Sequence, residues 1–187
     1  MALKLITEAT ALAITVAEAK AQAHVDTSDM DSRITAYIVA ATKMAEQATG
    51  RAIMPQTWEL TLDAFPCTFQ LTHVPVSAVS SIQYVDYAGT TQTLSETLYT
   101  LDRSDDHGCT YVVPVYMSIW PTARSQANAV TLRYTAGYAN AAAVPESIKL
   151  WIAAMVTTMI DNPASVDSKQ SYELGYVDRL LDAYKVW

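Results

Sequence analysis

The stretch PQTWELTLDA, Pro55–Ala64, alternates apolar and polar side chains. Its apolar members on one side of an extended chain are Trp58, Leu60, Leu62 and Ala64. A period of two is typical of a β-strand with one buried face. Before Pro55 the apolar residues recur at helical spacing instead. This change of period predicts a boundary between helical and β-rich sequence at Pro55.

Two helices are predicted before this boundary. Thr15 stands three residues before Glu18, the spacing of a capping box, and predicts a helix that runs to about Ala23. Thr27-Ser28-Asp29 offers N-cap side chains for a second helix over residues 30–49. The apolar stripe of the second helix consists of Ile34, Tyr37, Ile38, Ala41, Ala45 and Ala48. Gly50 supplies its stop.

Short strand candidates follow Pro55 until Gly137. After the first of them, these are Phe69–Thr72, Ser81–Tyr87, Thr91–Leu94, Tyr99–Asp102, Tyr111–Val115 and Val130–Ala136. Ala88-Gly89 suits a hairpin turn. Strands joined by such short connections predict an antiparallel arrangement.

Helical spacing returns at Pro145-Glu146 and continues to Asp161. This helix is apolar almost all round, so we expect it to be covered on several sides. A polar loop then leads to a short amphipathic helix over residues 176–184. Its apolar stripe consists of Val177, Leu180, Leu181 and Tyr184.

The predicted fold class is therefore α+β. We expect a small helical core from residues 1–54 and 141–187, with two N-terminal and two C-terminal helices. An antiparallel β-rich insertion occupies residues 55–140, and the whole chain, 1–187, forms one domain.

The composition excludes a nucleic-acid-binding role. The chain carries 19 acidic against 12 basic residues, a net charge of −7, and has no basic cluster for phosphates. Charged residues make up only 17% of the chain. Either Thr, Ser, Gln and Asn supply the polar surface, or part of the surface is buried against other subunits.

No catalytic motif is present, and we predict no catalytic residue, no metal ligand and no cofactor. The histidines His24, His73 and His107 lie in no catalytic spacing with a nucleophile or an acid. Asp102–His107 is interpreted as a solvated loop rather than a metal site. Asp26–Asp31 lacks the glycine and the final glutamate of a calcium loop.

Cys67 and Cys109 are interpreted as free thiols, and a disulfide between them stays open. The longest apolar run, Ile148–Ile160, is shorter than the roughly 20 residues that span a bilayer. The N-terminus has no secretory pattern. We expect a protein made without export, in the host cytoplasm, and no contact with a membrane.

Several segments together resemble the head–tail connector (adaptor) family of long-tailed phages, prophages and gene transfer agents. They are Thr15–Lys20 followed by Val25-Asp26, Ala48–Arg51 leading into Gln56–Leu60, Pro75-Val76 with Val79–Ile82 and Tyr84, Trp120-Pro121 with Arg124 and Asn128–Val130, and Ala136–Tyr138 with Val144–Glu146 and Ile148-Lys149. The order and spacing of these motifs carry the resemblance, which extends from about Thr15 to Met159.

The resemblance implies a structural protein of the virion neck, at the head–tail junction, and no enzyme. Its subunits would form a ring, a dodecamer if the family pattern holds, below the portal protein. The ring would extend the DNA channel, let DNA pass without specific binding, and receive the next neck or tail-completion (stopper) protein.

The same resemblance suggests where partners bind. C-terminal segments in the family commonly dock on the portal, and the expected docking residues are Val177, Leu180, Leu181, Tyr184 and Trp187. The alternative is that this helix folds back on its own domain and Trp187 frays. The apolar helix suggests a subunit interface through Trp151, Met155 and Met159. The alternative hypothesis is a small β-rich module that binds glycan or peptide, with Tyr116 and Trp120 as an aromatic platform.

Overall fold

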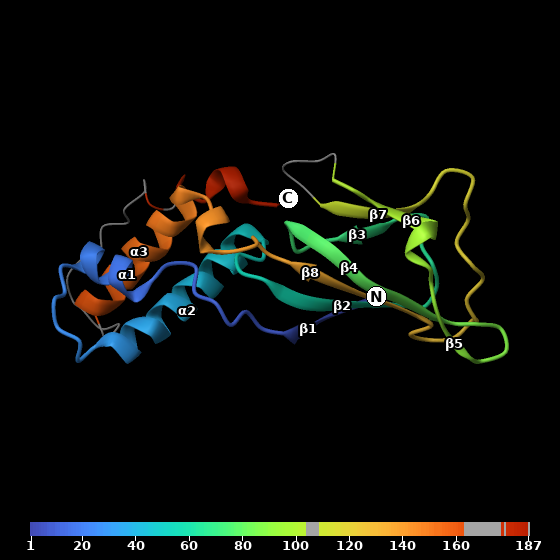
Figure 1. Ribbon diagram of the computed structural model, residues 1–187, viewed down its shortest axis with the longest axis horizontal. Coiled ribbons are helices and arrows are strands. Elements are labelled where there is room, and N and C mark those ends of the chain that lie inside the picture. The colour runs from blue at the N-terminus through green and yellow to red at the C-terminus, as the bar shows by residue number, and fades with distance from the viewer. Residues whose placement is uncertain (104–108, 163–176, 178, 187) are drawn as a thin grey trace. The chain divides into compact units, whose positions relative to one another are not determined.

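The computed structural model describes residues 1–103, 109–162, 177 and 179–186. The chain divides into two compact units (Figure 1). The sheet unit consists of residues 1–9 and 55–137, and the helical unit of the described part of 10–54 and 138–186. The predicted α+β class is confirmed, with the helices in one unit and the antiparallel strands in the other.

Helix α1, Val16–Ala23, begins at the predicted capping box. The Thr15 hydroxyl accepts from the Glu18 amide at 3.1 Å, and the Glu18 carboxylate accepts from the Thr15 amide at 2.6 Å. These hydrogen bonds hold the pKa of Glu18 below its usual value. His24 in the left-handed conformation ends the helix.

Helix α2, Asp31–Thr49, begins later than its predicted N-cap. Met30 is the N-cap residue and offers no capping side chain, so the prediction from Thr27-Ser28-Asp29 is wrong. Ser28 contributes its carbonyl to the Asp31 amide instead. The Asp31 carboxylate pairs with Lys20 of α1 at 2.8 Å and so ties the two helices together. Gly50 ends α2 with φ 71°.

Helix α3, Glu146–Asp161, contributes the largest side chains to the core of the helical unit. Its buried residues are Ile148, Trp151, Ile152, Ala153 and Val156. They meet the buried stripe of α2, which consists of Ile34, Ile38, Ala41, Ala45 and Thr49. Helix α1 packs on α3 as well, so two helices cover it within the described residues, while Leu150 is exposed.

The predicted count of four α-helices is wrong for the described residues, which contain three. The last part of the predicted fourth helix is a 3₁₀ turn, η3, Asp182–Tyr184. The Leu180 amide bonds back to Val177 and the Tyr184 amide to Leu181, three residues rather than four. The Val186 amide then bonds to the Thr49 carbonyl, which the chain reaches only after leaving helical conformation.

The sheet unit contains a five-stranded sheet in the order β1-β2-β8-β4-β5 and a three-stranded sheet in the order β3-β7-β6 (Figure 1). The strands are β1 Ala2–Thr7, β2 Gln56–Leu62, β3 Phe69–Leu71, β4 Val76–Val85, β5 Thr91–Thr93, β6 Tyr99–Asp102, β7 Thr110–Pro114 and β8 Val130–Ala136. All the printed strand pairs are antiparallel. The seven predicted strands are confirmed, although β4 begins at Val76, five residues before the predicted Ser81.

Strand β1 was not predicted, and residues 1–9 belong to the sheet unit rather than to the helical one. It pairs with β2 in a register that sets Leu3 opposite Leu60 and Leu5 opposite Trp58. Only two half-buried leucines mark the alternation of this edge strand. So short a pattern carries little signal in the sequence alone.

The core of the sheet unit lies on the face of the large sheet that carries Leu60, Leu132 and Ile82, which are opposite one another on β2, β8 and β4. Phe69, Leu71 and Val112 of the small sheet are buried as well. On β8, burial raises the pKa of Tyr134 to about 12. The antiparallel strands carry the connecting loops described below.

Candidate interaction surfaces

The histidines occupy structural positions where the structure describes them. His24 is the C-cap of α1. His73 stacks on Trp58 with ring centroids 3.8 Å apart, and burial lowers the pKa of its imidazole. His107, with most of the predicted acidic loop, lies outside the described residues. Within the described part of the chain, no cluster of three or more His, Cys, Asp or Glu could hold a metal ion.

Both cysteines are free thiols. Cys109 is buried, and its sulfur accepts from the Gln70 amide nitrogen at 3.0 Å. Cys67 is exposed. The two thiols therefore form no bridge.

The C-terminal segment, here residues 177 and 179–186, packs within the helical unit. Of the predicted docking residues, Val177 and Leu181 are buried, with Leu181 only 2% exposed. Leu180 and Tyr184 are half-buried, and Trp187 lies outside the described residues. The stripe thus divides into side chains that hold the segment and side chains that keep some free surface.

Arg51 fixes the end of this segment. The side chain is buried, and its Nε donates to the Tyr184 carbonyl at 2.6 Å. The Tyr184 hydroxyl accepts from Ser147 of α3 at 3.1 Å. Burial raises the pKa of Tyr138. The charge of Arg51 and its hydrogen bond to the tyrosine hydroxyl oppose this rise. The Arg51 guanidinium therefore joins the C-terminal segment to Tyr138.

The predicted subunit-interface residues of α3 differ in burial. Trp151 is 5% exposed and belongs to the core, and its indole nitrogen has no hydrogen-bond partner among the described residues. Met155 and Met159 are half-buried. Leu150, which we did not single out, is 47% exposed and adds apolar surface to the same helix.

Three highly exposed apolar side chains of the sheet unit lie in one loop after β7, Val115–Ile119, which we call the apolar loop, and Tyr87 in the turn between β4 and β5 is exposed as well. Tyr116, Met117 and Ile119 are 91%, 89% and 87% exposed. Sequence reasoning missed this loop as a surface and noticed only Tyr116. The available signal was a stretch without charge between Tyr111 and Ala123, which we interpreted as strand and turn.

Trp120 anchors the end of the apolar loop. Its ring stacks on Phe65 with centroids 5.5 Å apart and meets Phe69 edge-on at 5.3 Å. Its indole nitrogen donates to the Cys67 carbonyl at 3.1 Å. Tyr116 makes no ring contact with Trp120 in the described part of the molecule, so the two do not form the aromatic platform that the glycan hypothesis needs.

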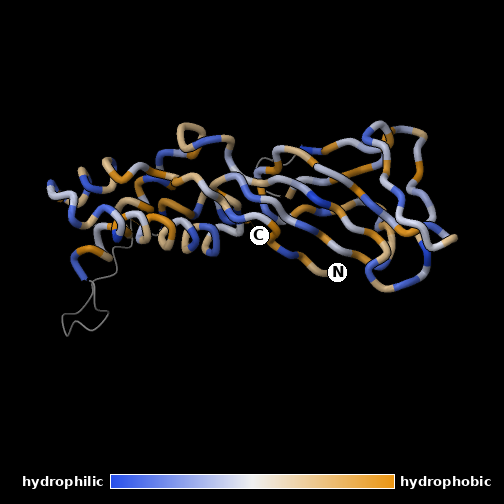
Figure 2. The backbone as a smooth tube through the Cα atoms, turned by 60° about the horizontal axis from the view of Figure 1, so that its bottom comes forward, coloured by the Kyte–Doolittle hydropathy of each residue, from blue (hydrophilic) through white to orange (hydrophobic). Residues whose placement is uncertain are grey.

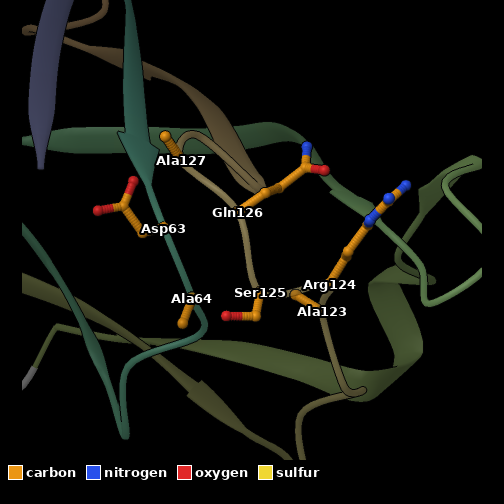
Figure 3. A pocket seen from close by; sticks show the side chains of 7 residues that line it. All are labelled: Asp63, Ala64, Ala123, Arg124, Ser125, Gln126 and Ala127. Atoms are coloured by element: carbon orange, nitrogen blue, oxygen red, sulfur yellow. The ribbon is translucent and has the colours of Figure 1, made fainter.

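A pocket of about 440 Å³ lies beside residues 123–127, which follow Trp120 in the connection between β7 and β8. We call it the loop pocket. Its lining includes Asp63 and Ala64 after β2, and Ala123, Arg124 and Ala127 before β8 (Figure 3). The Asp63 carboxylate accepts from the Asn128 amide at 2.8 Å. The wall that contains Asp63 is thereby held to the wall that contains Ala127.

Arg124 of the loop pocket keeps its charge available. Its amide donates to the Val85 carbonyl at 2.9 Å, but its guanidinium has no hydrogen bond or ion pair with another described residue. The guanidinium lies against Gly89, where a Cβ would be only 2.7 Å from its Nη1. Gly89 also has φ +87°, a conformation that favours glycine. The hairpin turn therefore leaves room for the arginine.

The outer face of the large sheet is polar and carries charges of both signs. Lys4, Glu59 and Arg133 are neighbours across β1, β2 and β8, and Arg133 bonds to Glu59 at 2.6 Å. An exposed ion pair of this kind contributes little to stability. The row presents no cluster of cations for a phosphate backbone.

Residues 13–97 match the phage gp6-like head–tail connector family. The predicted family resemblance is confirmed. The connector match spans α1 and α2 of the helical unit and continues through β2–β5 of the sheet unit, so it includes both units of the chain. No curated protein matches the sequence.

Solved structures with the same fold come from gene transfer agent particles. The virion of a native particle contains a chain with a TM-score of 0.81 at 20% identity, and the match covers 100% of this chain and 96% of that one. The neck of an empty particle, computed with C6 symmetry, gives the same values. The neck of a native particle, computed with C12 symmetry, gives a TM-score of 0.77 with the same identity and coverage. The connector-like chain thus shares its fold with these chains over its full length.

None of the helices described is both long and apolar enough to cross a membrane. Figure 2 shows apolar and polar residues interleaved along the helices and strands of both units. Among the described residues, exposed apolar side chains occur in both units, and three of them, Tyr116, Met117 and Ile119, lie in the apolar loop.

Proposed function

We propose that this chain is a head–tail connector (adaptor) of a virion neck, a structural subunit that joins head to tail. The match of residues 13–97 to the connector family carries the proposal. The full-length likeness to chains of gene transfer agent particles supports it, since the fold is retained at 20% identity. Its work is assembly rather than catalysis.

A ring is the form of assembly that this function requires. Necks that contain chains of this fold have been solved with C6 and C12 symmetry, which supports a dodecamer here. The ring lies below the portal protein, extends the DNA channel and receives the next neck or tail-completion (stopper) protein. The net charge of −7 suits a wall that DNA passes without binding.

Deletion of the gene from the genome that encodes the chain tests this function. We expect filled heads and free tails that do not join, and joined particles again when the wild-type gene is supplied. Mass spectrometry of the joined particles is expected to detect the chain. Normal joined particles without it would refute the proposal.

Loss of His107 is the matched test for the structural role. We expect His107→Ala to leave particle assembly near wild type. Unjoined particles with a normally folded His107→Ala protein would instead indicate a chemical role.

We propose that α3 contributes to the subunit interface through Met155 and Met159. Both are half-buried, and the same helix exposes Leu150 on another side, so α3 keeps apolar area for a neighbour. Trp151 supports this surface from the core. Met155→Lys is expected to prevent ring formation on the portal without unfolding the chain. Glu146→Lys, an exposed change of charge on the same helix, is the control.

We also propose that the C-terminal segment docks on the portal. Its buried residues, Val177 and Leu181, hold it to the helical unit, while Leu180 and Tyr184 leave side-chain area for a partner. Trp187 would extend the contact. The pair Leu180→Asp and Leu181→Asp tests this division. We expect Leu180→Asp to fold but not to bind the portal, and Leu181→Asp to lose stability. Normal portal binding by Leu180→Asp would contradict the docking role.

A further inference from the structure

The apolar loop is exposed but firmly held. At its start the Val115 amide donates to the Leu98 carbonyl at 3.1 Å, and within it the Ser118 amide donates to the Val115 carbonyl at 2.8 Å. Trp120 fixes its end to two phenylalanines. Met117 has φ +62°, which is uncommon for a residue other than glycine. A fixed loop that turns three large apolar side chains outward favours a contact with a protein surface.

The occupant of the apolar loop is a protein surface rather than nucleic acid. No charge lies between Tyr111 and Ala123, so the loop cannot neutralise phosphates. Tyr116 has an apolar ring and one hydroxyl, the combination that enters a small pocket with a polar end. A socket for it needs apolar walls and a hydrogen-bonding group.

The loop pocket on the same chain has these properties. It has a volume of about 440 Å³ and is open to solvent. Ala64, Ala123 and Ala127 line it with methyl groups, and Asp63 and Arg124 offer an acceptor and a donor on different sides of it (Figure 3). The guanidinium has no other partner in the described residues.

The apolar loop and the loop pocket are two different surfaces of one connection between β7 and β8. A cyclic ring requires such a pair, because each subunit gives one surface to the next copy and another to the previous one. Three side chains bury far less than the roughly 800 Å² per partner of a stable interface. The contact therefore does not dimerise the free chain and forms only where other contacts hold copies side by side.

We propose that Tyr116 of one subunit enters the loop pocket of the next copy of this chain in the ring, with its hydroxyl at Asp63 or Arg124. This inference rests on the proposed ring but adds a contact in the sheet unit, apart from α3 and the C-terminal segment. Met117 and Ile119 cover the rim of the pocket.

Site-specific crosslinking in purified particles tests the contact. Cys67→Ser is introduced first, because Cys67 is an exposed thiol. Two variants of this chain, Tyr116→Cys and Ala127→Cys, are then produced together in one host, so that both enter the same rings. Mild oxidation is expected to give a covalent dimer that reducing agent removes. Each variant alone is expected to give none, because like positions do not meet in a head-to-tail ring.

The control replaces Ala127→Cys by Ala78→Cys, an exposed alanine on β4 outside the pocket. Equal dimer yields for the two mixtures would overturn the pocket contact. So would normal assembly of Tyr116→Asp, which we expect to keep its thermal stability but to enter rings at least tenfold less often. Absence of the wild-type chain from joined particles would instead refute the proposed function itself.

Discussion

The C-terminal segment of the helical unit and the apolar loop of the sheet unit both carry large apolar side chains, but the segment buries or half-buries them, whereas the loop exposes them. The segment buries Val177 and Leu181, and its Tyr184 carbonyl accepts from Arg51. The loop is held at its end by the ring contacts of Trp120 and leaves Tyr116 and Met117 in solvent. The apolar side chains anchor the first and are displayed by the second.

This difference teaches that the position of the anchor, not apolar content, distinguishes a packed segment from a contact surface. In the segment, the residues that hold it are the stripe itself. The end of the apolar loop is held by the ring of Trp120, which lies outside Val115–Ile119, so the large side chains within the loop stay exposed. Substitutions test this difference, because the loss of a buried anchoring side chain should lower stability and the loss of an exposed one should not.

The largest effect is expected at Leu181. Leu181→Ala removes a side chain that is 2% exposed, and buried leucine truncations cost about 2–5 kcal/mol. Urea denaturation measures this loss. The control is Leu150→Ala, at a side chain 47% exposed, for which we expect a change within about 0.5 kcal/mol. Equal effects of the two substitutions would mean that the segment is not packed as described.

Arg51 ranks next. Arg51→Met keeps much of the side-chain volume but removes the donor to the Tyr184 carbonyl, and hydrogen bonds to charged groups contribute about 1.5–3 kcal/mol. We expect a loss of that size in urea denaturation. Because Arg51 opposes the rise in the pKa of Tyr138, the same substitution is expected to raise that pKa further. A tyrosine absorbance titration that shows no such rise would remove Arg51 from this role.

The sequence predicted the strands of the sheet unit well because alternation and turn residues are local signals. Trp58 and Leu60 mark β2 by themselves, and Gly89 marks a turn. It did not reveal β1, because an edge strand with two half-buried leucines resembles many irregular segments. The start of α2 was misplaced because three good capping residues precede a helix whose first turn is fixed instead by the ion pair of Asp31 with Lys20.

The interaction surfaces were harder to predict than the elements. The stripe of Val177 and Leu181 indicates an amphipathic segment in the sequence, but only the fold decides whether its own unit covers it. Tyr116 was noticed as an aromatic, yet its separation from Trp120 depends on Phe65 and Phe69, which lie on a distant part of the chain. Long-range contacts of this kind leave no periodic signal.

The anchor of the apolar loop is expected to have a smaller effect than Arg51. Trp120→Leu keeps an apolar side chain but removes two ring contacts, each worth about 0.5–1.5 kcal/mol. We expect a loss of about 1–2 kcal/mol and faster amide hydrogen exchange in residues 115–119. Protection equal to wild type would show that the loop is held without Trp120. Trp120→Phe is the matched control, because it retains an aromatic ring.

The smallest effect on the free chain is expected at Tyr116. Its side chain is 91% exposed, so Tyr116→Ser removes almost no buried area, and surface substitutions usually change stability within about 0.5 kcal/mol. Urea denaturation of the monomer is therefore expected to match wild type. A loss as large as that of Trp120→Leu would mean that Tyr116 packs within its own unit and is not displayed. In the particle the two substitutions are expected to differ. Tyr116→Ser weakens ring assembly without changing the stability of the free chain, whereas Trp120→Leu lowers both the stability of the free chain and ring assembly. A side chain that combines a neutral effect on folding with a defect in assembly has its partner outside its own chain, and the crosslink of Tyr116→Cys to Ala127→Cys identifies that partner as another copy.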